Sequence, residues 1–411
     1  MISAPRVAFF ADSFHEVNGV ANTCRHFEAF ACRRSLPFLS IHAGETTKQF
    51  QDGSITSLEL RRGPLKFALD SDLGFDLALW RYVKPIIKAV HDFKADLVHI
   101  TGPSDVGQLG AYVAYKLGLP LVASWHTNLH DFASRRVESL LSYVPDKPRK
   151  HIASFVDRQV LRWVLRFYCI PGVLMAPNRE LAEMIASHTG KPTYLMQRGI
   201  DTELFSPARR DCDNDKFTIG YVGRLTPEKN VRLLADIEAS VLAAGHVNFR
   251  FIIVGEGSER AWLERNMRHA EMTGVLRGNA LARAYANMDL FIFPSETDTF
   301  GNVVLEAIAS GVPAIVSEKG GPKFIIEQGV CGYAALTGQD FFEAADLLMT
   351  DEGLRNGMKS AARLRAQKFS WDRVFEEVYR AYAVSIEMKR IEKMKAGNEK
   401  VTVRSAEDFG F

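Results

Sequence analysis

Short runs of unbroken apolar residues, each followed by a longer amphipathic segment, recur along the whole chain. In the first half the runs are RVAFFAD, LPFLSIHA, ADLVHIT and LPLVASW (residues 6–12, 36–43, 95–101 and 119–125). In the second half they are FTIGYVG, FRFIIVG, DLFIFP and PAIVS (217–223, 249–255, 289–294 and 313–317). Strands of a parallel sheet read as unbroken apolar runs because helices cover both of its faces. The pattern predicts an α/β fold of two Rossmann-like, doubly wound domains facing across a ligand-binding cleft.

Length and local composition suggest where the domains divide. A chain of 411 residues is long enough for two domains. The polar, turn-rich segment 198–216 is the expected connection, so we expect an N-terminal domain at 1–197 and a second domain at 198–370. An aromatic-rich helix is expected at 371–388. The charged residues 389–411 are expected to form a fraying helix and a flexible tail.

Overall composition narrows the function classes and the compartment. The net charge is +2, so the chain has no general basic field for nucleic acid, and no nucleic-acid partner is expected. The five cysteines are scattered without a CxxC pair, which argues against a disulfide framework or a cysteine-rich zinc site. No signal-peptide pattern or membrane-length apolar run occurs. We therefore expect a cytoplasmic protein.

The first motif with chemical content is VGRLTPEKN (222–230), at the end of an expected strand. It places Arg224 and Lys229 in a turn that leads to a helix. Two cations at the mouth of a cleft suit a diphosphate, because Arg offers a planar fork and Lys a compact charge. The alternative is a solvated loop with ordinary surface charges.

The second motif is SETDTFGNVVLEAIASG (295–311), also after an expected strand. Gly301 precedes an expected helix whose first amides and dipole attract phosphate oxygens. Asp298 in the loop and Glu306 in the helix could accept hydrogen bonds from sugar and ribose hydroxyls. In the alternative interpretation, Asp298 caps the helix and Glu306 is a surface residue.

These motifs, with VGEGSER (254–260) and RGIDTELFSP (198–207), resemble the retaining nucleotide-sugar glycosyltransferases of family 4, which have the GT-B fold. The resemblance covers residues 6 to 382. NGVANT (18–23) and SWHTN (124–128) are similar to the subgroup of bacterial mannosyltransferases and sulfolipid synthases. In GT-B enzymes a C-terminal helix like 371–388 crosses back onto the first domain.

The resemblance implies a role for individual residues. Arg224 and Lys229 would hold the donor diphosphate, the amides near Gly301 would bind the sugar and β-phosphate, and Glu306 would bind the ribose. The full donor-binding set that it implies is Gly19, Arg224, Lys229, Gly255, Asp298, Phe300, Gly301, Asn302, Val303 and Glu306. The acceptor side would comprise Asn18, Gly19, His126 and Thr127. The catalytic set would be His126, Arg224, Lys229 and Asp298.

The resemblance also implies the reaction. A hexose would pass with retention from a nucleotide diphosphate to a lipid or glycan hydroxyl, with GDP-mannose preferred and UDP-sugars the other option. Cations and a helix start would stabilise the leaving diphosphate, so no metal and no cofactor are expected. His126 would lie near the donor sugar; otherwise it is a core or capping histidine.

Two positions depart from the family pattern. Asp298 stands where the family usually has Glu, so its carboxylate reaches one methylene less far. His15 and Glu16 replace the Leu-Pro often found in the loop after the first strand.

Other interpretations stay open. Arginines 158, 162 and 166 form a stripe within 147–168, which indicates either peripheral contact with the inner face of a membrane or a core helix with a solvated basic side. The glycines of VGEGSER lack the rest of a nicotinamide fingerprint. A nucleotide-sugar epimerase or hydrolase, or a non-catalytic nucleotide-sugar-binding protein, remains an alternative function.

Overall fold

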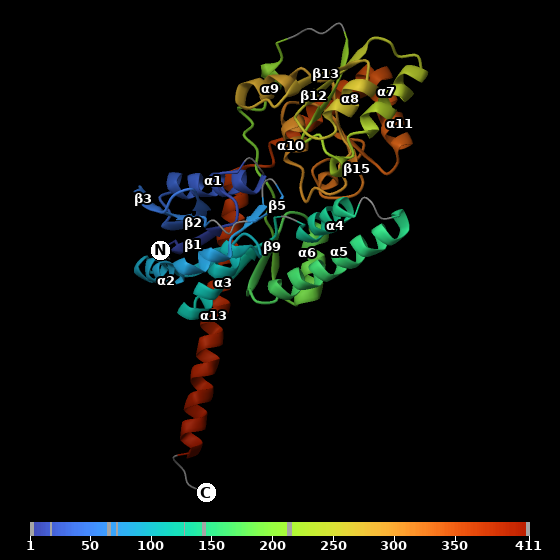
Figure 1. Cartoon of the computed structure of the whole chain (residues 1–411). Coiled ribbons are helices and arrows are strands. Elements are labelled where there is room, and N and C mark those ends of the chain that lie inside the picture. The colour runs from blue at the N-terminus through green and yellow to red at the C-terminus, as the bar shows by residue number, and fades with distance from the viewer. Residues whose placement is uncertain are drawn as a thin grey trace. The chain divides into compact units, whose positions relative to one another are not determined.

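The computed structural model describes residues 4–16, 19–63, 67–70, 73–126, 128–141, 145–211 and 216–407. The chain divides into two compact units: unit 1 comprises residues 1–196 and 372–411, and unit 2 comprises residues 197–371 (Figure 1). Each unit is built around a mainly parallel sheet with helices, so the predicted α/β class with two doubly wound sheets is confirmed.

Within the described residues, the main sheet of unit 1 has eight strands in the order β10-β9-β8-β7-β1-β2-β4-β3. Every pairing in it is parallel except β3 with β4, and β5 and β6 form a separate antiparallel ribbon. The bounds are β1 Val7–Ala11, β2 Phe38–Gly44, β3 Lys48–Asp52, β4 Ile55–Arg61, β5 Phe67–Asp70, β6 Leu73–Phe75, β7 Leu97–Ile100, β8 Leu121–Ser124, β9 Val173–Ala176 and β10 Thr193–Leu195.

The helices of unit 1 follow from local capping and from apolar faces. Ser104 caps the amino end of α3 by accepting from the amide of Gly107, and Gly118 ends the helix in a left-handed conformation. The bounds are α1 Gly19–Arg33, α2 Val83–Asp92, α3 Asp105–Leu117, α4 Leu129–Leu140, α5 Asp146–Tyr168, α6 Arg179–Thr189 and α13 Trp371–Glu407, with a 3-10 turn at Leu77–Tyr82.

Both faces of the unit 1 sheet are covered. On one face Phe9 meets Phe27 of α1 edge to face, and Phe27 stacks on Phe375 of α13 with 4.4 Å between ring centroids. On the other face Phe10 and Ile41 belong to a core shared with α2, α3, α5 and α6. Full burial of such a side chain contributes about 1.5–3 kcal/mol. This double cover explains why the strands read as unbroken apolar runs.

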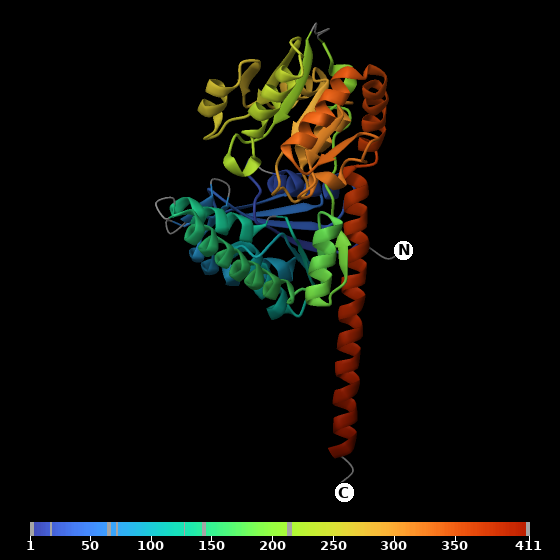
Figure 2. The ribbon, with the colours of Figure 1, turned by 90° about the vertical axis from the view of Figure 1, so that its right-hand side faces the viewer.

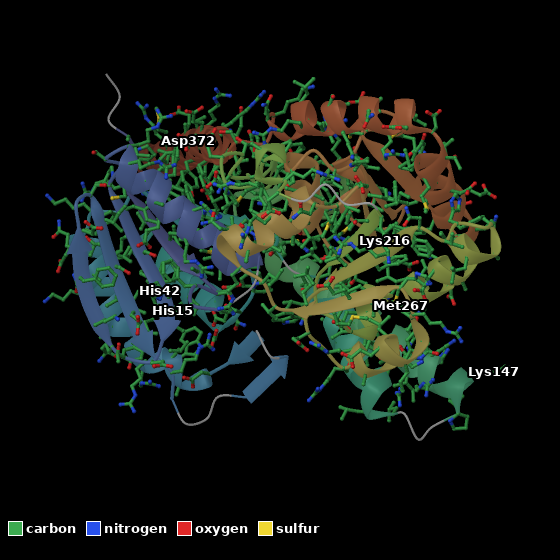
Figure 3. All side chains as sticks on the ribbon, turned by 90° about the horizontal axis from the view of Figure 1, so that it is seen from above. His15, His42, Lys147, Lys216, Met267 and Asp372 are labelled. Atoms are coloured by element: carbon green, nitrogen blue, oxygen red, sulfur yellow. The ribbon has the colours of Figure 1, made fainter. Side chains whose placement is uncertain are left out.

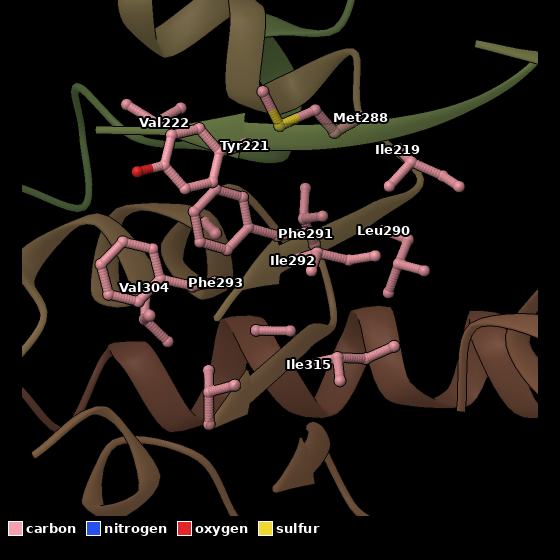
Figure 4. Packing of buried hydrophobic residues seen from close by; sticks show 14 of the residues in the cluster. Ile219, Tyr221, Val222, Met288, Leu290, Phe291, Ile292, Phe293, Val304 and Ile315 are labelled. Atoms are coloured by element: carbon pink, nitrogen blue, oxygen red, sulfur yellow. The ribbon is translucent and has the colours of Figure 1, made fainter. Parts of the chain in front are cut away.

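The described sheet of unit 2 has six parallel strands in the order β13-β12-β11-β14-β15-β16. Figure 4 shows Tyr221 of β11 and Phe291 and Phe293 of β14 in its core, where the rings of Tyr221 and Phe293 stack. The bounds are β11 Phe217–Val222, β12 Phe249–Val254, β13 Ala270–Gly274, β14 Leu290–Phe293, β15 Ala314–Ser317, β16 Gly332–Ala335, α7 Leu233–Ala243, α8 Arg260–Asn266, α9 Gly278–Ala286, α10 Asn302–Ala309, α11 Gly338–Thr350 and α12 Glu352–Ala366.

The C-terminal segment differs from the expectation. A fraying helix and a flexible tail were expected at 389–411, but α13 is one continuous helix to Glu407, as Figures 1 and 2 show. The buried face of α13 includes Tyr382 and Ser385, whereas Met388, Ile391 and Met394 farther along are 39–61% exposed, so that part of the helix lacks the packing that usually stabilises a helix. Residues 408–411 lie outside the described part of the chain.

Candidate functional site

The sheet of unit 2 reverses its strand order between β11 and β14. From β11 the chain moves outward to β12 and β13, then returns to β14 on the other side of β11. The loops at the carboxyl ends of these neighbouring strands leave in opposite directions, which is where open α/β sheets bind ligands. Arg224 and Lys229 lie in the loop after β11, and Asp298 lies in the loop after β14.

Lys229 and Asp298 form the central contact of this region. The ammonium of Lys229 lies 2.9 Å from Oδ1 and 2.7 Å from Oδ2 of Asp298. Burial acts to raise the pKa of Asp298, but the charge and hydrogen bonds of Lys229 outweigh it and hold the pKa below its usual value. Arg224 contributes to the same effect and lies 3.7 Å from Glu228 Oε1. Two cations and two carboxylates therefore share one cluster.

The loop after β14 ends at Gly301, which begins α10. Its φ of 98° is a left-handed conformation, and a Cβ there would lie 2.8 Å from Pro322 Cγ. Asn302 and Val303 form the first turn of α10, where backbone amides have no partner within the helix. The Phe300 ring is buried near Phe369, so its side chain belongs to the core and only its backbone can meet a ligand.

Glu306 lies one turn into α10 and is held by a residue that the sequence analysis did not single out. Tyr285 of α9 donates its hydroxyl to Glu306 Oε2 over 2.9 Å. Burial raises the pKa of Glu306 to about 7, although the bond from Tyr285 acts to lower it. Glu306 is therefore neither a solvated surface acid nor a fully ionised one at neutral pH.

Gly255 has a packing role in this structure. Its φ is 143°, and a Cβ would lie 1.9 Å from the carbonyl oxygen of Gly223. The loops after β11 and β12 are also joined by a bond of 2.9 Å from the amide of Leu225 to the carbonyl of Glu256. The close approach of these loops fixes the backbone beside Arg224.

In unit 1, His126 directly follows β8. It is the last member of a buried series of hydrogen-bonded side chains. The Tyr382 hydroxyl lies 2.6 Å from His99 Nδ1, His99 Nε2 lies 3.0 Å from Ser124 Oγ, and Ser124 Oγ lies 2.7 Å from His126 Nε2. All four residues are buried.

Which side chain donates in each of these hydrogen bonds follows from the rule that a buried hydroxyl or ring N–H needs an acceptor. Among the described residues, His99 is the hydrogen-bond partner of the Tyr382 hydroxyl, so Tyr382 donates to Nδ1. Burial lowers the pKa of His99 to about 3, so its ring is neutral with its proton on Nε2, which donates to Ser124. Ser124 then donates to Nε2 of His126. In this arrangement Nε2 of His126 is a hydrogen-bond acceptor, so a proton on its ring lies on Nδ1 when the ring is neutral.

The strand order of unit 1 also reverses, between β1 and β7. Asp12 follows β1 there, accepts a hydrogen bond of 2.5 Å from Ser104 Oγ, and has its pKa raised to about 7, chiefly by burial. Gly19 is the first residue of α1. Asn18 and Thr127, expected on the acceptor side, lie outside the described residues.

Helix α5 carries the basic stripe expected at 147–168. Ala153, Val164, Leu165 and Tyr168 form its buried side. Trp163 is 46% exposed and Phe155 is 53% exposed. Arginines 158, 162 and 166 are exposed as well. Among the described residues, no helix has the length and apolarity needed to cross a membrane.

The structure thus groups Arg224, Lys229 and Asp298 in unit 2, with Gly301 and Glu306 on the adjoining loop and helix, and places His126 and Gly19 after strands of unit 1. The sequence analysis missed Glu228, Tyr285, Asp12, Ser104, Ser124, His99 and Tyr382. A signal existed for His99, because a histidine inside the apolar run LVHI is unusual. None existed for Tyr285 or Tyr382, which resemble ordinary core residues.

Two protein-family models match the chain. The model described as Glycosyltransferase Family 4 matches residues 39–204, and the model described as Glycosyl transferases group 1 matches residues 205–365. A GDP-mannose-dependent alpha-mannosyltransferase of Mycobacterium tuberculosis is 30% identical over 392 residues, which cover 92% of this chain and 96% of that protein. A protein of the same name from Mycolicibacterium smegmatis is 33% identical over 308 residues, 72% of this chain and 76% of that protein.

Solved structures share the fold. The structure of Anabaena HepE in complex with UDP and glucose matches with a TM-score of 0.62 and covers 92% of this chain and 99% of that one. The sequence identity is 16%, so this likeness shows the fold alone.

Proposed function

The chain belongs to glycosyltransferase family 4 and has the GT-B fold, and on that premise we propose that it transfers mannose from GDP-mannose to a lipid hydroxyl with retention. The family membership makes it a glycosyltransferase. The donor is proposed from the curated relatives that are named for GDP-mannose. The lipid acceptor is proposed from the surface of α5, and retention from the resemblance of the motifs to the retaining enzymes of family 4.

The observation that carries this proposal is the cluster of Arg224, Lys229 and Asp298 at the strand-order reversal of unit 2. Lys229 is held in place by Asp298 before any donor arrives, so little side-chain entropy is lost when a diphosphate binds. The start of α10 adds amides and a positive dipole end. This arrangement suits a group that carries two phosphate charges.

In the proposed reaction, the bond between the anomeric carbon and the diphosphate oxygen breaks as the sugar becomes oxocarbenium-like. The acceptor oxygen forms the new bond on the face that the diphosphate leaves. The acceptor proton passes to the departing phosphate oxygen. Arg224, Lys229 and the α10 amides stabilise the charge that develops on this phosphate, so the step requires no divalent ion.

Asp298 is assigned to the donor sugar. The bidentate pairing with Lys229 orients the short Asp298 side chain, which would accept from a sugar hydroxyl while the ammonium faces the phosphate. In unit 1, the hydrogen bonds through Ser124 orient the His126 ring, and His126 is proposed as a group of the catalytic and acceptor side. Glu306, positioned by Tyr285, would accept from the ribose.

The lipid acceptor is proposed from the surface of α5. Ile152, Phe155 and Trp163 are 41–53% exposed on the same helix as Arg158 and Arg162, whose side chains are also exposed. Aromatic side chains with interspersed arginines are typical of helices that lie at the surface of an anionic membrane. Peripheral contact would bring the enzyme to a membrane-bound hydroxyl.

The test is a transfer assay with radiolabelled GDP-mannose and a total lipid extract, followed by separation of organic-phase product and free GDP. We expect labelled lipid and equimolar GDP, with UDP-sugars poorer donors. Arg224→Ala should lower kcat/KM by ~100-fold, as for loss of one preorganised donor to a developing charge. Arg283→Ala is the matched control, because Arg283 is an exposed cation of unit 2 paired with Asp211, outside the cluster.

Other results would select the alternatives. GDP and free mannose without labelled acceptor would indicate a hydrolase, and a changed sugar still attached to the nucleotide would indicate an epimerase. Tight donor binding without turnover would indicate a binding protein. Equal activity of the Arg224 and Arg283 variants would refute the assignment of the diphosphate site.

A further inference from the structure

The facing side chains of β2 and β4 in unit 1 include a buried group that is polar, although buried side chains of a sheet are usually apolar. Ser40 and His42 of β2 lie opposite Ser57 and Glu59 of β4 in the parallel register. All four are at most 3% exposed. Buried polar groups are costly unless they are satisfied, so an atom among them without a hydrogen bond indicates a missing partner.

The loop after a third strand, β1, contributes to the same place. His15, in the loop after β1, brings Nε2 to 3.2 Å from Glu59 Oε2, and its ring lies 5.0 Å from that of His42 (Figure 3). One potential ligand atom from each of these three residues lies within 4.8 Å of the others. We propose that His15, His42 and Glu59 bind a zinc ion. The proposal is independent of the transferase reaction.

An unsatisfied polar atom provides separate support. The Nδ1 atom of His42 is buried and has no hydrogen-bond partner, while its Nε2 lies 3.2 Å from Ser57 Oγ. Orphaned polar atoms of this kind indicate an ion or an ordered water that the protein chain alone does not supply.

The surroundings hold two of the three ligands in fixed orientations. The Phe14 ring stacks on His42 with centroids 4.0 Å apart and planes 4° apart. The amide and hydroxyl of Thr46 donate to Glu59 Oε1 over 3.1 and 2.8 Å. Such outer contacts orient metal ligands, and here they leave Oε2 of Glu59 directed at His15.

The chemistry of the set selects the metal. Two imidazoles and one carboxylate suit zinc, with water as a fourth ligand, whereas magnesium and calcium prefer oxygen ligands. The ligand atoms must contract around the ion. His15 can move, since its side chain is 52% exposed. Lys48, 3.4 Å from Glu59 Oε2 and also exposed, must turn away from the incoming charge.

The expected consequence is local. His15 lies in the loop that leads from β1 toward α1, and zinc would attach this loop to β2 and β4. A ligand that binds only the folded chain raises its stability by mass action. Zinc should therefore raise the Tm of the full chain.

The experiment uses the tag-free full chain, freed of metal by dialysis against a chelator. Zinc is then titrated in competition with a chromophoric zinc indicator. We expect one high-affinity site per chain and no comparable site for magnesium. Loss of a ligand should cost at least as much as loss of an outer-shell contact, so His15→Gln should weaken binding by ~100-fold. Its Tm without zinc should stay that of the wild type, because the side chain is exposed.

Two control variants sharpen the result. His91→Gln removes an exposed histidine of α2 that is likewise paired with a carboxylate, Asp92, and should bind zinc like the wild type. Lys48→Gln removes the competing ammonium and should bind zinc at least as tightly. Equal affinity of the His15 and His91 variants, no high-affinity site, or a zinc-soaked crystal with only water between the three residues would overturn the proposal.

Discussion

At the scale of single residues, Lys229 and Asp298 test whether the cluster serves the donor or only the fold. Lys229→Met leaves a partly buried carboxylate without its cation, which should lower the free energy of unfolding by about 1–3 kcal/mol. It should also reduce kcat/KM for GDP-mannose by ~100-fold. Adding Asp298→Asn removes the unpaired charge, so the double variant should regain stability in urea unfolding. Recovery of activity by the double variant would show that the pair is structural.

Glu306 makes the stability of the chain depend on pH. Its pKa is about 7 in the folded chain and 4.5 when exposed, so between these values the folded state binds more protons than the unfolded state. Stability contributed by this group is thus present below pH 4.5 and falls as pH rises through 7. In the wild type, Glu306 should lower the free energy of unfolding by on the order of 2 kcal/mol between pH 5 and pH 8. Glu306→Gln should lack this loss. An unchanged pH profile in urea unfolding would contradict this assignment.

At the scale of elements, the close approach of the loops after β11 and β12 determines the position of Arg224. Gly255→Ala places a Cβ 1.9 Å from the Gly223 carbonyl, so the loops must separate. We expect a loss of about 2–4 kcal/mol in unfolding free energy and a higher KM for the donor. Gly245→Ala is the control, because Gly245 also has a positive φ but no atom within 4 Å of the added Cβ. Equal effects of the two variants would mean that backbone strain, not loop contact, is responsible.

Helix α5 gives a prediction about membranes. Phe155→Ala with Trp163→Ala removes two exposed rings without touching the buried side of the helix. The double variant should sediment less with anionic vesicles, while its Tm stays unchanged. Trp80→Ala removes a similarly exposed ring outside α5 and should sediment like the wild type. Sedimentation independent of all three rings would contradict the proposed contact.

The elements also show what sequence periodicity can predict. Central strands such as β1 and β11 are buried on both faces, so their unbroken apolar runs predict them directly. Strand β3 is fully exposed and polar, KQFQD, and β13 is a polar edge strand. Their formation depends on hydrogen bonding to a neighbouring strand, which no local pattern of the chain reports. The continuous extent of α13 to Glu407 was likewise not predicted, since its last turns lack a buried face that a local pattern could report.

At the scale of the whole molecule, the ease of predicting a site depends on how far its residues are separated along the chain. Arg224 and Lys229 share one short motif, and Asp298, Gly301 and Glu306 share another, so the sequence predicts both groups of the proposed donor site. The hydrogen-bond series that positions His126 includes a bond between His99 and Tyr382, which are 283 positions apart in the sequence. Only the folding of α13 onto unit 1 brings them together. Such support for a candidate catalytic group cannot be inferred from motifs.

This long-range support leads to the last prediction. Tyr382→Phe removes the donor to His99 Nδ1, so His99 can keep its proton on either nitrogen and His126 loses its fixed tautomer. We expect kcat to fall about tenfold with KM nearly unchanged, the equivalent of one hydrogen bond of about 1.4 kcal/mol. The pH dependence of kcat should shift as well, which a merely structural tyrosine would not cause.

The adjacent Tyr379 provides the control for this prediction. Its hydroxyl is buried without a hydrogen-bond partner among the described residues, so Tyr379→Phe removes an oxygen that contributes no bond. Tyr379→Phe should keep the wild-type kcat and pH profile and should equal or exceed the wild type in Tm. Two results would contradict this role: an equal loss of kcat in both variants, or a change in Tm for Tyr382→Phe without a change in the pH profile of kcat. In either case α13 packs against the rest of unit 1 but does not set the protonation of His126.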